Sequence, residues 1–205
     1  MFSPVSGQLR LFPSGVLTHN EAFPVVTGLV WRHRTTLITG ASKTQLALQL
    51  AHAVASGHPF LEMTVPSPLP VLYICQRLRP DDLAYRLRNL TLYFGAPKAV
   101  LHHVSTKGDF IREKQIRDLM DAHRPGLLVL DSLLLNIETT PIIRHFGCAV
   151  ALVHPCQLTA DATAVVAEDE EDSSDYPTFM LHIKRGGHEQ SFKIRRLGAV
   201  FTLVS

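Results

Sequence analysis

The residues best suited to chemistry form a Lys-Thr pair at the start of an apolar, helix-like stretch. The segment GASKT, residues 40–44, follows the apolar run 35–39, and apolar side chains repeat at helical spacing over 43–56. In this position a loop of the type G-x-x-x-x-G-K-[ST] wraps phosphates with backbone N–H groups, while Lys neutralises charge and Ser or Thr holds magnesium. The candidate nucleotide-binding residues are therefore Gly40, Ser42, Lys43 and Thr44.

The glycine loop in front of this pair is three residues shorter than the ordinary motif, and Ser42 stands where the second glycine is expected. So short a loop cannot easily encircle a phosphate. A structural interpretation therefore stays open beside the functional one. In it, Ser42 caps the start of a helix, and Lys43 and Thr44 are ordinary helix residues.

Strand-like apolar runs alternate with helix-like segments along most of the chain. The strand-like runs are 35–39, 71–75, 100–104, 126–135 and 148–154, and the helix-like segments are 43–56, 80–94 and 109–123. Near-continuous apolar strands separated by helices are typical of a parallel sheet covered on both faces. The closing segment 179–204, with its Gly186-Gly187 turn, adds antiparallel strands. We predict an α/β, three-layer fold with a mostly parallel sheet.

Length and composition predict one domain. The chain has 205 residues, 46% of them hydrophobic, and a net charge of +2, which favours neither a nucleic-acid nor an anionic-membrane partner. We expect residues 1–24 to be an extended arm, 25–205 the domain, and 157–177 an acidic flexible loop around the five acids 168–172. Three unpaired cysteines and no leader indicate a cytoplasmic protein, and the apolar runs are too short to span a membrane.

A set of segments in a fixed order resembles the RecA-like P-loop ATPases of the hexameric plasmid replicative helicase group, which is RepA-like and in the AAA family. These segments are LALQLAHAVASGHPFLE, VLYI, RPDDLAYRL, LLVLDSL and VALVHP, within about residues 37–154. The resemblance implies a RecA-like fold, with ATP and magnesium as possible cofactors. It also implies that Lys43 contacts phosphate and that Thr44 and Asp131 hold magnesium. Asp131 is otherwise explained as a polar residue that ends a buried strand.

The same resemblance implies further roles and reveals a departure. The family's water-activating glutamate aligns with Arg77, and a guanidinium is always charged and cannot accept a proton, so Arg77 cannot be a general base. His154 matches a polar sensor, and Lys184 and Arg185 match a basic hairpin that reaches the phosphates of a neighbouring subunit. A structural His and a solvated hairpin turn are the alternatives for these positions.

Two features weigh against DNA contact by the usual route of such folds. The segment 136–147 is too short for both a full helix and a DNA-facing loop, and the acidic segment after His154 would repel phosphates. A basic cluster near the end of the chain either follows a nucleic-acid backbone or forms a solvated sheet face. Its members are Lys184, Arg185, Lys193, Arg195 and Arg196.

We therefore expect an ATPase-fold protein of DNA replication or recombination with weakened or lost ATP hydrolysis. It would act by self-association or by assembly with RecA-like relatives, with DNA a possible partner. The first alternative is an active ATP-dependent DNA helicase or helicase loader whose phosphate loop is rebuilt. The second is a nucleotide-independent interaction module in which the acids 168–172 dock a basic partner.

Overall fold

Strands and helices alternate along the chain in the computed structural model, which describes residues 23–40, 42–106, 111–131, 139–153, 163–170, 177–185 and 188–204. The helices are α1 Lys43–Ser56, α2 Pro80–Phe94, α3 Glu113–His123 and α4 Thr139–Phe146. The strands are β1 Pro24–Val26, β2 Val30–Trp31, β3 Thr35–Gly40, β4 Val71–Cys75, β5 Leu101–Ser105, β6 Leu127–Asp131, β7 Ala149–Val153, β8 Thr163–Glu170, β9 Thr178–Arg185, β10 His188–Leu197 and β11 Val200–Leu203.

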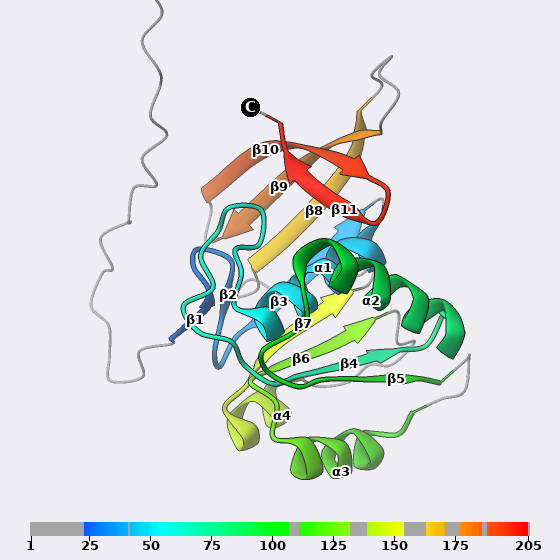
Figure 1. Ribbon diagram of the computed structural model, residues 1–205. Helices are drawn as coiled ribbons and strands as arrows, with labels where there is room; N and C mark the ends of the chain where they lie inside the picture. The colour runs from blue at the N-terminus through cyan, green and yellow to red at the C-terminus, as the bar shows by residue number, and fades with distance from the viewer. Residues whose placement is uncertain are drawn as a thin grey trace, which may run out of the picture.

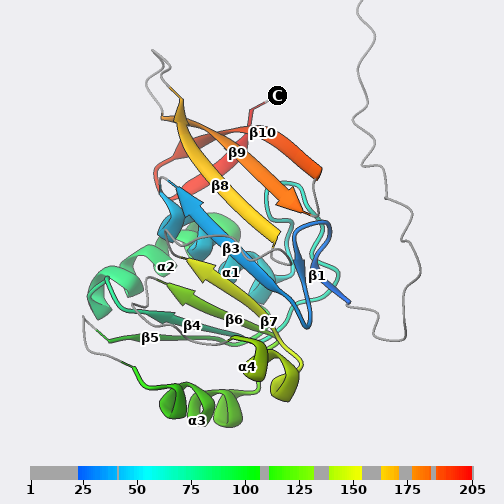
Figure 2. The same cartoon turned by 180° about the vertical axis from the view of Figure 1, so that it is seen from behind.

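Nine of these strands form one sheet in the order β11-β10-β9-β8-β3-β7-β6-β4-β5. The strands from β8 to β5 in this order are parallel, whereas β9, β10 and β11 continue the sheet antiparallel. Figure 1 shows the antiparallel strands rising from one side of the parallel sheet, and Figure 2 shows the same sheet from behind. The predicted α/β, mostly parallel sheet with antiparallel strands at the C-terminus is confirmed.

Helices cover the two faces of the parallel sheet and give the predicted three layers. Helices α1 and α2 pack with Tyr73 and Cys75 of β4 in one buried cluster, whereas α3 and α4 pack with Leu72 and Ile74 in another. This division follows from the period of a strand, because successive side chains point to opposite faces of the sheet. Helix α1 is buried from Gln45 to Ser56, since α2 and β11 also pack against it.

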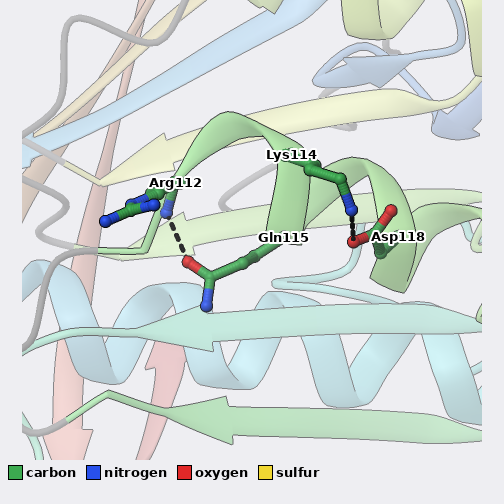
Figure 3. A network of polar contacts seen from close by, with 4 residues as sticks. All are labelled: Arg112, Lys114, Gln115 and Asp118. Carbon is green, nitrogen blue, oxygen red and sulfur yellow. Dashed lines mark hydrogen bonds and ion pairs between the residues drawn. The ribbon is translucent and has the colours of Figure 1, made fainter.

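The helix ends are set by the residue types there. Helix α1 stops at Gly57, which has φ 72° and donates its N–H to the Ala53 carbonyl at 2.8 Å. A Cβ on Gly57 would lie 3.0 Å from Cδ of Pro68, so glycine is required there for space as well as conformation. At the start of α3, the Arg112 N–H donates to Oε1 of Gln115 at 2.8 Å, beside the exposed Lys114–Asp118 pair at 3.0 Å (Figure 3).

The acidic segment differs from its prediction. Residues 163–170, expected within the flexible loop 157–177, form β8, which pairs parallel with β3 and antiparallel with β9. Three of the five consecutive acids, Glu168 to Glu170, therefore belong to a strand. The prediction of a loop rested on the acidic charges and overlooked the β-branched residues that precede them. Pairing with β3 and β9 makes the segment a strand. Residues 157–162 and 171–176 lie outside the described residues.

Other expected boundaries move by a few residues. Pro24, assigned to the arm 1–24, belongs to β1, and residues 1–22 lie outside the described part of the chain. The helix expected over 109–123 begins at Glu113, and the strand expected over 126–135 ends at Asp131. The short segment 136–147 contains the eight-residue helix α4. In the described part of the chain, no helix is both long and apolar enough to cross a bilayer.

Candidate functional site

The site starts where the parallel strands β3, β4 and β6 end, at one edge of the sheet. Asp131 is the last residue of β6 and is fully buried. Thr44 is the last residue of the GASKT segment and lies in the first turn of α1. The Thr44 hydroxyl donates to Oδ1 of Asp131 at 3.2 Å, although 87 residues separate the two in the chain. The structure thus brings together the two residues predicted to hold magnesium.

The second oxygen of Asp131 receives donors from β4. The Tyr73 hydroxyl donates to Oδ2 at 2.7 Å, and the Cys75 thiol lies 3.6 Å from the same oxygen. Strand β4 lies beside β6 with Cys75 opposite Asp131, so Tyr73 and Cys75 project from the same face of β4. Sequence reasoning missed both residues. Their signal was two polar side chains at alternate positions of the buried strand VLYIC.

Burial and the Asp131 charge keep both donors protonated. The pKa of Tyr73 is raised well above its ordinary value of 10, first by burial, then by the Asp131 charge and the hydrogen bond to that carboxylate. The pKa of Cys75 is raised to about 11, again first by burial and then by Asp131. At neutral pH both side chains are hydrogen-bond donors to Asp131, and Cys75 is not a reactive thiolate.

The start of α1 is not an ordinary serine cap. Ser42 occupies the N-cap position with φ 53° and ψ 18°, in the left-handed region, and its side chain makes no capping hydrogen bond. Gly40 also has a positive φ, 88°, and no acidic residue lies in the first turn of the helix. Ser42 therefore occupies the predicted cap position but does not cap the helix with its side chain. Its backbone is strained, and the side-chain hydrogen bond that normally stabilises a serine N-cap is missing.

Lys43 is half-buried at the first position of α1, next to Thr44. In the described part of the chain its ammonium group has no hydrogen bond or ion pair. Gly40, Ser42, Lys43 and Thr44 thus lie together at one end of α1, close to Asp131. Ala41 lies outside the described residues.

Arg77 lies in the turn after β4 and is exposed. The turn is held by its neighbours, since Leu78 donates its N–H to the Cys75 sulfur at 3.4 Å and the Ser105 hydroxyl donates to the Leu78 carbonyl. The N–H of Gln76 donates to the Asp131 carbonyl at 3.2 Å, which ties the turn to the end of β6. The position that aligns with the family's general base is therefore close to the site in the chain and carries an exposed cation.

The other predicted site residues are scattered. His154 follows β7 and lies outside the described residues. Lys184 is exposed on β9 and pairs with Glu189 of β10 at 3.5 Å, and Glu189 also lies 3.0 Å from Nδ1 of His182. Arg185 ends β9, and its side chain lies outside the described residues.

The remaining members of the basic cluster do not share one face. Lys193 and Arg195 stand opposite Met180 and Thr178, on the face of β10 that also carries Glu189. Arg196 lies on the other face, where its Nε donates to the Gly198 carbonyl at 2.9 Å. The predicted cluster is thus divided by the strand period and includes an acid.

Two buried amides that sequence reasoning missed link α1 to the C-terminal hairpin. Gln49 donates to the Phe201 carbonyl at 2.9 Å and accepts the Phe201 N–H at 2.7 Å. Gln45, the residue after Thr44, donates to the Ala199 carbonyl and accepts from Arg86 of α2 at 3.3 Å. Their signal was two glutamines four residues apart, each followed directly by apolar residues of α1.

A protein family described as AAA domain matches residues 21–135, more than half of the chain. The matched range contains β1 to β6, and therefore the GASKT segment, Tyr73 and Asp131. No curated protein matches the chain. The resemblance to ATPases of this class is confirmed at the level of the AAA-type P-loop fold, and the RepA-like group stays a prediction.

Proposed function

Because the chain belongs to the AAA domain family and has its ATPase fold, we propose that it is a RepA/RecA-like ATPase-fold protein of DNA replication or recombination. In this proposal its ATP hydrolysis is weakened or lost, and it acts by assembly with partners. The observation that carries the nucleotide part is the hydrogen bond between Thr44 and Asp131 at the end of the parallel strands.

The residues at this edge suit ATP and magnesium. A hydroxyl and a carboxylate are the oxygen ligands that magnesium prefers, and a lysine at a helix N-terminus favours bound phosphate. Lys43 would neutralise phosphate charge, and Thr44 and Asp131 would hold the ion. Magnesium bound with ATP would neutralise charge on the phosphates.

Two features support weak hydrolysis. The GASKT loop is short and contains a strained Ser42 in place of glycine, which reduces the number of backbone N–H groups that can surround a phosphate. Arg77 stands where the related ATPases carry the glutamate that activates water, and it cannot accept a proton. Binding and chemistry are thus weakened separately.

The test is titration of the purified protein with a fluorescent ATP analogue, with and without magnesium, while phosphate release is followed in the same samples. We expect binding that Lys43→Ala weakens at least tenfold and release near the buffer rate. Lys114→Ala is the matched control, because it removes an exposed lysine on α3, on the opposite face of the sheet from α1. An absence of binding at millimolar nucleotide would refute the proposal.

An active ATPase is the second candidate, and the intact Thr44–Asp131 pair favours it. This candidate predicts magnesium-dependent phosphate release that Lys43→Ala abolishes. If the missing base is the limiting defect, Arg77→Glu raises the release rate and leaves nucleotide affinity within about twofold. Release by the unmodified protein well above the buffer rate would select this candidate over the first.

Assembly is the partner component of the proposal, with a second copy or a RecA-like relative as the partner. It is supported by the exposed Lys184 beside Arg185 and by the Gln45 and Gln49 bonds, which connect the C-terminal strands to the nucleotide helix. Light scattering with and without nucleotide tests it. We expect Lys184→Ala to lower the molar mass of any assembly, whereas the exposed control Lys98→Ala does not.

DNA is the other candidate partner. The Lys184–Glu189 pair and the position of Arg196 on the opposite face weigh against a continuous phosphate-binding track on β9 and β10. Fluorescence anisotropy with labelled single-stranded and duplex DNA tests this partner. Binding that weakens steeply with salt would establish it.

A further inference from the structure

The geometry points to Tyr73 as a positioning residue that fixes the Asp131 carboxylate for the magnesium-holding pair Thr44 and Asp131. This inference rests on the proposed function, since it concerns the same site. It adds a residue that neither the P-loop motif nor the family match singles out.

The two oxygens of Asp131 have different partners. Oδ1 accepts from the Thr44 hydroxyl at 3.2 Å, whereas Oδ2 accepts from the Tyr73 hydroxyl at 2.7 Å. The shorter distance is typical of a charge-assisted bond between a hydroxyl and a carboxylate. The Cys75 thiol, 3.6 Å from Oδ2, is a weak donor by nature. Tyr73 therefore makes the shorter of the two hydroxyl bonds that restrain rotation of this carboxylate.

Tyr73 is itself held rigidly. Its side chain is fully buried in the cluster formed with α1 and α2, and β4 is paired with β6 over its whole length. The Tyr73 hydroxyl also lies 3.5 Å from the Thr44 carbonyl, so a single phenol contacts both members of the pair. A buried phenol needs a polar partner, and here that partner is a functional carboxylate.

The two oxygens of Asp131 therefore have different roles in this arrangement. Tyr73 holds Oδ2, and Oδ1 faces the Thr44 hydroxyl on the side of the nucleotide loop. Without the Tyr73 hydroxyl, Oδ2 loses its short bond and the carboxylate gains rotational freedom that magnesium binding must remove. Loss of partners that orient a metal ligand typically costs about 10–100-fold in metal affinity.

The experiment uses Tyr73→Phe, which removes one oxygen and keeps the buried ring. Affinity for the fluorescent ATP analogue is measured across a magnesium series and in EDTA. We expect the half-saturating magnesium concentration to rise about tenfold, with affinity in EDTA unchanged. Thr36→Val is the matched control, because it also removes one buried hydroxyl, bonded at 3.3 Å to the Leu29 carbonyl, and should leave the magnesium midpoint in place.

An unchanged midpoint in Tyr73→Phe would overturn the inference, as would an equal loss of affinity in EDTA, which is the mark of a merely structural role. A second variant, Cys75→Ala, keeps the test decisive if Tyr73→Phe does not fold. We expect it to shift the midpoint by less than about twofold, and a tenfold shift would assign the positioning to the thiol instead. Failure of the unmodified protein to bind nucleotide would instead overturn the proposed function.

Discussion

Removal of the buried imidazole of His52 should abolish a large part of the acid sensitivity of folding. His52 lies on α1 with no exposed surface, and its pKa is lowered from 6.5 to about 4, first by burial and then by the neighbouring His58. Its Nδ1 lies 3.3 Å from Nε2 of His58 and 3.3 Å from the Ser56 hydroxyl, and its Nε2 lies 3.4 Å from the Thr91 hydroxyl. A second proton on this ring would put a charge beside His58 in the interior.

The sign and size follow from this pKa. Above pH 6.5 His52 is neutral in both the folded and the unfolded state, so it adds no pH dependence. Between pH 6.5 and about 4 only the unfolded state takes up the proton, and the free energy of unfolding falls as the pH is lowered. At 1.36 kcal/mol per pKa unit, the loss reaches ~3 kcal/mol at pH 4 and then levels off.

Urea unfolding at a series of pH values measures this. We expect the free energy of unfolding of His52→Gln to fall by ~3 kcal/mol less than that of the unmodified protein between pH 7 and pH 4. The exposed Gln190→Ala, which removes no titratable group, is the control and should leave the slope unchanged. Parallel curves for His52→Gln and the unmodified protein would refute the reasoning, because the buried ring would then titrate as it does in the unfolded chain.

Three further predictions concern the loop, the C-terminal hairpin and the cysteines. Ser42→Gly should raise the free energy of unfolding by ~1 kcal/mol, because the left-handed backbone costs serine about that much and no cap hydrogen bond is lost. Urea unfolding measures this change, and a destabilised variant would contradict the prediction. Gln49→Leu should lower the free energy of unfolding by ~2–3 kcal/mol, because both buried hydrogen bonds to the Phe201 backbone are lost. Calorimetry measures this change in stability, and a loss below ~0.5 kcal/mol would show that the amide is dispensable. Cys75 and Cys148, whose pKa values burial raises to about 11, should resist iodoacetamide at pH 7.5 until the chain unfolds. Mass spectrometry of labelled peptides measures the modification. Rapid labelling of either cysteine in the folded protein would show that its thiol is not buried as described.

The fold class was predictable because its signal is local and repeated. Apolar runs such as 71–75 and the helical spacing of 43–56 each specify one element, and their alternation restricts the sheet to a mostly parallel arrangement. The same local reading failed for 163–170, where a dense run of charge outweighed strand propensity. There the pairing with β3 and β9, which no local pattern encodes, decides the structure.

The sequence by itself determined which residue types were available for a nucleotide site: a short glycine loop, a Lys-Thr pair, an acid at the end of a buried strand, and arginine at the position of the base. The tertiary structure alone decided that Thr44 meets Asp131 across 87 residues, that Tyr73 takes the second carboxylate oxygen, and that the C-terminal basic residues divide between two faces. The reason is physical. Residue type and period act within an element, whereas a hydrogen bond between elements depends on the order and register of strands that are far apart in the chain.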